Sequence, residues 1–122
     1  MSKYIDGFAL PIRKEHIDEY QQVAKQVAAV WKEHGAIEYC ECVGDDMNLE
    51  GTRSFVNAVN ANEDEVIVFG WVTFPSKELR DMANAKVPND PRMAEIVAPL
   101  TDANRLIFDA SRMVYGGFNT LV

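Results

Sequence analysis

The chain has 122 residues, 48% of them hydrophobic and 25% charged, which is enough for one domain that buries its own core. Its formal net charge of −7, with the basic residues scattered, argues against binding to nucleic acid, whose phosphates would be repelled. No apolar run approaches the roughly 18 residues of a membrane-spanning helix, and the start, MSKYIDGFALP, lacks the apolar region of a secretion signal. We therefore expect one cytoplasmic domain over residues 1–122, with no membrane partner.

The first third of the chain predicts a strand, a long helix and a second strand. Residues 4–12 carry apolar side chains on both sides of an alternating pattern, which is typical of a strand covered on both faces. Pro11, near its end, indicates an edge or a strand exit. Residues 13–35 place apolar side chains at helical spacing, and Gly35 is suited to end that helix in a left-handed cap. Residues 36–43 then predict a strand that carries both cysteines.

The middle of the chain predicts a hairpin. A polar loop at 44–52 is followed by RSFVNAV, residues 53–59, which we expect to form a short strand. A turn at 60–64 leads to EVIVFGWVTF, residues 65–74, a β-prone apolar run that fits a central strand buried on both faces. We therefore expect these two strands to pair antiparallel.

The last third predicts a broken helix and a closing strand. Ser76 is expected to cap one helix, and Asp90 a second helix that starts with a proline. The sequence RMVYGGFNTLV, residues 112–122, then predicts the last strand. Because no helix follows Gly116 and Gly117, we expect them to form a strand bulge that bends the sheet, and not a phosphate-binding loop.

This order of elements predicts an α+β, ferredoxin-like fold, in which helices cover a single face of an antiparallel sheet. The strands carry apolar residues on both sides, so the other face of the sheet must be covered too. A second copy of the chain is the simplest cover. We therefore expect a homodimer that joins through the sheet face.

Three segments resemble a known family: YIDGFALPI near the start, PSKELRDMANAKVPNDPRM in the second helical region, and RMVYGGF near the end. Nearly the whole chain is similar to the DUF1428 family, small bacterial proteins of unassigned function. The resemblance implies membership of the dimeric α+β barrel superfamily, alongside antibiotic biosynthesis monooxygenases, haem-degrading monooxygenases and stress-response or binding proteins. It implies a barrel closed by two subunits and supplies no catalytic residues, because a shared fold does not imply a shared activity.

Candidate site residues therefore come from local chemistry. A ligand cavity in such a subunit is expected between the sheet and the helices that cover it. The polar and aromatic residues that we expect to line it are Asp6, Trp31, Trp71, Arg112, Tyr115 and Asn119.

Asp6 interrupts the apolar alternation of the first strand. A buried carboxylate needs a partner or takes up a proton, and Arg112 is the mate that we expect. The functional interpretation is a carboxylate that binds or deprotonates a small organic ligand. The structural alternative is an Asp that satisfies a neighbouring loop, capping group or strand end. Trp31 and Trp71 likewise either stack on an aromatic ligand or form plain core.

No metal or cofactor site stands out in the sequence. Cys40 and Cys42 would project to the same side of a strand about 7 Å apart, so we expect free thiols and neither a disulfide nor metal ligands. His34 is favoured near a helix end by the helix dipole. The common nucleotide, hydrolase, zinc-protease and calcium-loop patterns are absent, and we expect no cofactor.

Two functions remain open. In the first, which we favour because no acid/base pair is evident, the protein binds a small organic ligand or acts in a stress response without catalysis. The alternative is a cofactor-independent or haem-using monooxygenase-like enzyme, with a pocket formed by Asp6, Trp71, Arg112 and Tyr115.

Overall fold

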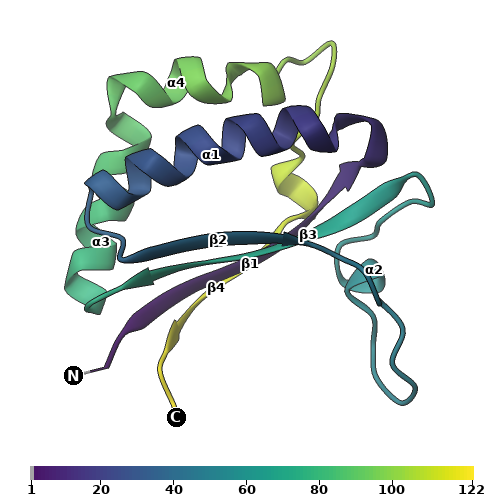
Figure 1. Ribbon diagram of the computed structural model, residues 1–122, viewed down its shortest axis with the longest axis horizontal. Helices are drawn as coiled ribbons and strands as arrows, with labels where there is room; N and C mark the ends of the chain where they lie inside the picture. The colour runs from purple at the N-terminus through teal and green to yellow at the C-terminus, as the bar shows by residue number, and fades with distance from the viewer. Residues whose placement is uncertain (1) are drawn as a thin grey trace.

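The computed structural model describes residues 2–122, and its framework is a four-stranded antiparallel sheet with its three longer helices on one face (Figure 1). The strand order is β2-β3-β1-β4, which confirms the predicted ferredoxin-like fold. The strands are β1 (Tyr4–Arg13), β2 (Glu38–Val43), β3 (Glu65–Phe74) and β4 (Val114–Asn119), and the helices are α1 (Ile17–Glu33), α2 (Phe55–Ala58), α3 (Lys77–Lys86) and α4 (Pro91–Val97).

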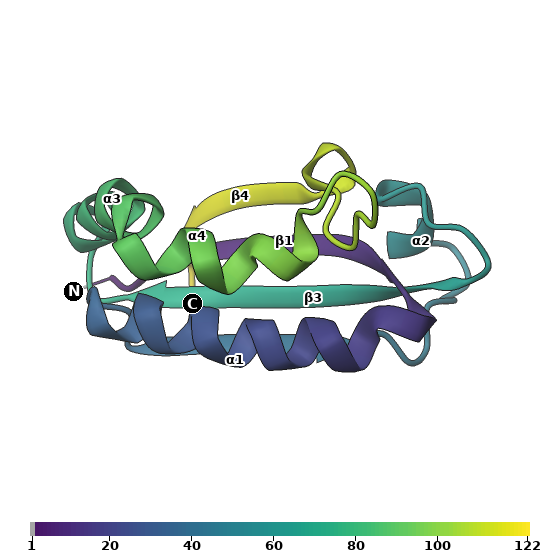
Figure 2. The ribbon, with the colours of Figure 1, turned by 90° about the horizontal axis from the view of Figure 1, so that it is seen from above.

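The three longer helices lie on the same face of the sheet. Figure 2 shows α1 and α4 side by side over the strands, with α3 near one end. The predicted helix ends are confirmed: Gly35 has a φ of 115° after α1, and the Ser76 side chain accepts a hydrogen bond from the backbone of Leu79. Among residues 2–122, no helix has both the length and the apolar character needed to span a bilayer.

The main core lies between α1 and the two central strands, β1 and β3. Leu10 and Ile12 of β1 pack with Val68 of β3 and with Tyr20 and Val23 of α1. These side chains become buried because the apolar stripe of α1 faces the apolar face of the sheet.

Residues 53–59 do not form the predicted strand. They contain the short helix α2, which begins after Ser54, whose side chain accepts a hydrogen bond from the backbone of Val56. The prediction that residues 53–59 pair with β3 in a hairpin is therefore wrong, and β3 pairs with β2 and β1 instead. A short apolar run does not by itself distinguish a strand from a helical turn, and here the Ser54 cap favours the helix.

We call the second face of the sheet the open face, because helices α1, α3 and α4 do not cover it (Figure 1). Val59 and the segment around it cover one end, where they pack on Ala9 and Ile67. The remainder exposes large apolar side chains, with Phe118 57% and Phe69 41% exposed.

Gly116 and Gly117 do not form the predicted bulge. Their pairing with β1 is continuous, one residue to one, with Gly117 opposite Asp6. A Cβ atom at Gly117 would lie 2.5 Å from the Tyr4 hydroxyl oxygen and 2.9 Å from an Arg80 nitrogen. Glycine is needed at this position because other side chains approach the backbone closely, which is a different reason from a bend in the strand.

Pro11 lies beyond the four-stranded part of the sheet, which ends at Ala9. β4 pairs with β1 only as far as Ala9, so beyond that residue β1 is bonded only to β3. The missing N–H of Pro11 therefore leaves no ladder position unfilled on the β4 side, and the predicted local edge is confirmed.

Candidate functional site

A cavity of about 490 Å³ lies between the sheet and the helices that cover it. Its wall is mostly apolar, with contributions from all four strands and from α1, α3 and α4. This volume is within the range of cavities that hold small organic ligands. The polar side chains that line it are Asp6, Tyr20, Tyr39, Glu41, Asn84, Thr101 and Tyr115.

The strand register brings the first polar group together. Asp6 and Phe8 of β1 are two residues apart, so both side chains point to the helix-covered face. Tyr115 of β4 is the direct partner of Phe8 and therefore points to the same face. Asn84, on α3, completes this end of the cavity.

Asp6 is buried, with only 4% of its surface exposed, and its neighbour is Arg80 of α3. The Arg80 Nε atom lies 3.6 Å from the Asp6 Oδ1 atom, too far for a hydrogen bond, and both atoms are buried without a hydrogen-bond partner. Arg80 donates instead from Nη2 to the Tyr4 hydroxyl at 2.8 Å and lies over the Tyr4 ring. It also contacts Asp81, at 3.4 Å.

Burial controls the ionisation of Asp6. Loss of solvation raises the pKa of this carboxyl above its ordinary value of 3.8, and Asp81 acts in the same direction. Hydrogen bonding with Tyr115, the positive charge of Arg80 and hydrogen bonding with Asn84 lower the pKa, but not enough to offset the burial. The Asp6 side chain lines the cavity, and its Oδ1 atom lacks a hydrogen-bond partner.

A second polar group lies on β2. The two oxygens of Glu41 accept hydrogen bonds from the hydroxyls of Tyr20 and Tyr39, the latter at 2.6 Å. Burial, and then the charge of Glu41, raise the pKa of both tyrosines, so their hydroxyls stay protonated as donors. Both donors are already used, and Glu41 adds a negative charge to the cavity wall.

The structure brings together three of the six predicted residues. Asp6, Trp31 and Tyr115 line the cavity. Trp71 is on the open face, where its Nε1 atom donates to Glu38 at 3.0 Å. Asn119, the partner of Tyr4 at the end of β4, is exposed and does not line the cavity. Side chains alternate along β3, so Trp71 points away from the face on which its neighbour Val72 lines the cavity.

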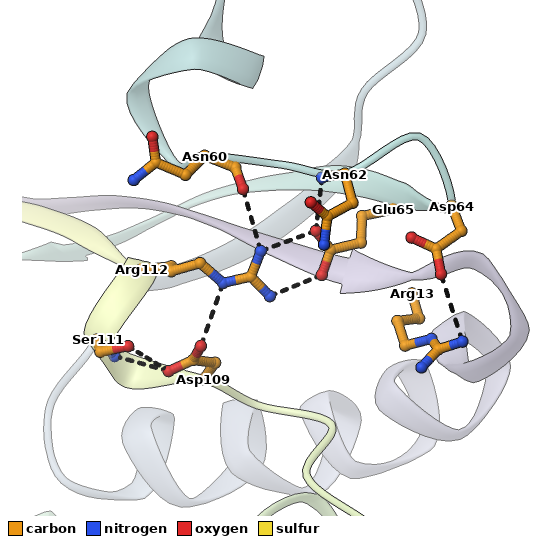
Figure 3. Close-up of polar contacts among 8 residues, drawn as sticks. All are labelled: Arg13, Asn60, Asn62, Asp64, Glu65, Asp109, Ser111 and Arg112. Atoms are coloured by element: carbon orange, nitrogen blue, oxygen red, sulfur yellow. Dashed lines mark hydrogen bonds and ion pairs between the residues drawn. The ribbon is translucent and has the colours of Figure 1, made fainter.

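Arg112 is not the mate of Asp6. It lies at the far end of β1, where its Nη1 and Nη2 atoms donate to the two oxygens of Glu65 at 2.8 and 2.6 Å (Figure 3). Its Nε atom donates to Asp109 at 3.1 Å, and Nη1 also donates to the backbone oxygen of Asn60. This bidentate ion pair joins the start of β3 to the segment before β4 and has a structural role. The four residues expected around an oxygenase pocket are therefore not assembled in one place.

Three residues that carry the cavity chemistry were missed from the sequence. Arg80 and Asn84 are four residues apart on α3 and therefore share a helix face, but this spacing does not show which residues of the sheet they approach. Glu41 alternates with Cys40 and Cys42 along β2, so it points to the helix side as the cysteines point away.

The two cysteines and His34 lie outside the cavity wall. Cys40 and Cys42 are free thiols on one side of β2, with their sulfur atoms 3.8 Å apart. His34, at the end of α1, contacts Asp90 at 2.9 Å. Among residues 2–122, no cluster of three or more His, Cys, Asp or Glu side chains is arranged to hold a metal ion.

The chain matches the family described as protein of unknown function DUF1428 over residues 3–109. A relative from Escherichia coli strain K12, the uncharacterized protein YbaA, is 39% identical over 120 residues, a match that covers 98% of this chain and 97% of the relative. A protein of the same name from Shigella flexneri has the same identity and coverage.

Solved structures support the fold. A NIPSNAP-like domain protein from Burkholderia xenovorans is similar with a TM-score of 0.57 at 13% identity, and the match covers 98% of this chain and 85% of that one. A dimeric ferredoxin-like protein from an uncultured marine organism has a TM-score of 0.54 at 9% identity, with coverage of 100% and 96%. At these identities the likeness concerns the fold alone.

Proposed function

This chain belongs to the DUF1428 family, and we propose that it binds a small organic ligand in the cavity between its sheet and helices. The observation that carries the proposal is Asp6, a buried carboxylate in the wall of an apolar cavity whose Oδ1 atom lacks a hydrogen-bond partner. Buried polar groups are normally hydrogen-bonded, so one that is not calls for an explanation, and a ligand in the cavity is the explanation that we propose. A role in a stress response stays a prediction.

The size and composition of the cavity support binding. Its volume of about 490 Å³ suits a ligand of one or two rings, and its wall is dominated by aliphatic and aromatic side chains. Trp31 contributes one such side chain, and its position is fixed by edge-to-face packing on Phe74, with the ring centres 6.2 Å apart.

The test is calorimetric titration with three naphthalene derivatives of similar size: naphthylmethylamine, naphthylmethanol and naphthoate. At least one should bind, and the substitution Ala24→Leu should abolish that binding, because Ala24 lines the cavity and leucine would fill part of it. The matched control is Ala29→Leu, at an exposed position of the same helix, which should bind normally. Failure of all three compounds, or equal binding by both variants, would refute the proposal.

The open face supports a second part of the proposal, a homodimer. Phe118 and Phe69 are 57% and 41% exposed there, Val114 is 40% exposed, and Trp71 lies beside Phe69 with ring centres 5.8 Å apart. A continuous apolar surface of this kind is typical of an interface. The similar marine protein is itself described as dimeric. Pairing of two open faces would bury these side chains and close the barrel.

A further inference from the structure

We propose that the cavity selects a positively charged organic molecule, an amine with an aromatic or aliphatic body, and rejects organic anions. This inference rests on the proposed ligand-binding function and names the chemical class of the ligand. It follows from the charges in the wall, from the unfilled hydrogen-bonding capacity of Asp6, and from the aromatic side chains around them.

The charges around the cavity are predominantly negative. Asp6 and Glu41 line it, whereas none of the described residues in its wall is Lys, Arg or His. Arg80 is the nearest cation to Asp6, and it is shared with Asp81, at 3.6 and 3.4 Å from the two carboxylates. One arginine therefore faces two acidic groups, and Glu41 adds a third. An organic anion would be repelled by this arrangement, and a cation would be attracted.

The unfilled hydrogen-bonding capacity is that of an acceptor. The Oδ1 atom of Asp6 lacks a hydrogen-bond partner among the described residues, and burial of the carboxyl penalises its charged form. An ammonium group supplies both a donor and a compensating charge, whereas a hydroxyl supplies only a donor. The tyrosine hydroxyls at Glu41 are already committed to that carboxylate, so they do not compete for the ligand.

Aromatic rings supply a further preference for a cation. The face of an aromatic ring carries partial negative charge and attracts a cation that lies over it. Several aromatic side chains, contributed by strands, by α1 and by the segment before β4, line the same cavity as the two carboxylates. They are Phe8, Tyr20, Trp31, Tyr39, Phe108 and Tyr115.

The ranking of the three naphthalene probes tests this inference. At neutral pH naphthylmethylamine is a cation, naphthylmethanol is neutral and naphthoate is an anion. We expect the amine to bind at least about tenfold more tightly than the alcohol, with naphthoate the weakest. Equal or tighter binding of the alcohol or of naphthoate would overturn the charge preference and leave the ligand-binding proposal intact. Failure of all three probes would instead overturn ligand binding itself.

Substitutions test whether Asp6 causes the preference for an amine. Asp6→Asn should reduce amine affinity to about that of the alcohol and leave alcohol binding within about twofold, because it removes the charge and keeps the shape. Glu95→Gln is the matched control, since Glu95 is an exposed carboxylate on α4 outside the cavity wall, and it should change neither affinity. A folded Asp6→Asn protein, judged by its melting transition, that still prefers the amine overturns the role of Asp6. Should that variant not fold, the probe ranking on the unmodified protein decides.

Discussion

Asp6 is a buried carboxylate that the sheet holds beside an arginine without completing a hydrogen bond between them. Arg80 offsets part of its charge, and burial raises the pKa of Asp6 in spite of that neighbour. The pair lies at one end of the cavity and costs the fold some stability. A cost of this kind is typical of residues that are retained for binding.

Removal of the arginine should expose the cost of the buried carboxylate. Arg80→Gln leaves Asp6 without its compensating charge, and we expect a loss of about 2 kcal/mol in unfolding free energy at neutral pH. The raised pKa means that protonated Asp6 favours folding below its ordinary pKa of 3.8, and that this contribution is lost as pH rises through the folded pKa. Urea titrations should therefore show a smaller loss near pH 4. A loss that is equal at both pH values would contradict the assignment.

Gly117 is constrained by Tyr4 and by the same arginine. We expect Gly117→Ala to reduce the unfolding free energy by about 1–3 kcal/mol, because the new methyl group would meet the Tyr4 hydroxyl 2.5 Å away. The neighbouring Gly116→Ala is the control. Its methyl group would meet only the Phe118 ring, at 3.2 Å, on a side chain that is exposed and can move. Denaturant midpoints that do not separate the two variants would show that close approach is not the reason for the glycine.

Among the secondary-structure elements, those with a periodic pattern or a capping residue were predictable from the sequence. The apolar stripe of α1 and the caps at Ser76 and Asp90 are local signals, and the structure confirms them. The short helix α2 was not predictable, since four residues carry too little periodicity to separate a helix from a strand. Arg80 was missed as the partner of Asp6 because their contact depends on how α3 docks on the sheet. The two residues are 74 positions apart in the sequence, and this separation does not indicate whether they are in contact.

Helix α4 depends on Asp90, which joins it to the end of α1. Hydrogen bonds from Arg92 and then His34 hold the pKa of Asp90 well below its ordinary value of 3.8. We expect Asp90→Ala to lower the melting temperature and to weaken ligand binding, because α4 contributes Met93 and Val97 to the cavity wall.

The effect should depend on pH. A depressed pKa means that ionised Asp90 stabilises the fold above pH 3.8, and that this contribution is lost as pH falls through the folded pKa. The difference in melting temperature between Asp90→Ala and the unmodified protein should therefore shrink in strong acid. Glu95→Ala, on the exposed side of the same helix, should change the melting temperature little; an equal effect of both variants would argue against the cap.

In the whole molecule, the two faces of the sheet have different surroundings and, we propose, different roles. The helix-covered face encloses the cavity, whereas the open face presents Phe118, Phe69 and Trp71 to a second copy. The two tryptophans divide in the same way, with Trp31 on the cavity side and Trp71 on the open face.

The dimer is tested at the open face. A charge at Phe118 should prevent association, because it would be buried without a partner in the interface. We expect the unmodified protein to have a dimer mass by light scattering at micromolar concentration, and Phe118→Glu to have a monomer mass. Leu121→Glu is the control, at a position already 94% exposed near the chain end, and should leave the mass unchanged. A monomer mass for the unmodified protein would contradict the homodimer.

The most direct test of ligand binding is a crystal structure of the protein soaked with naphthylmethylamine. We expect density for the naphthalene rings between the sheet, α1 and α4, with the ammonium nitrogen within hydrogen-bond distance of the Asp6 carboxylate. Rings bound against Trp71 and Phe118 on the open face, with the cavity empty beside Asp6, would contradict the proposed site.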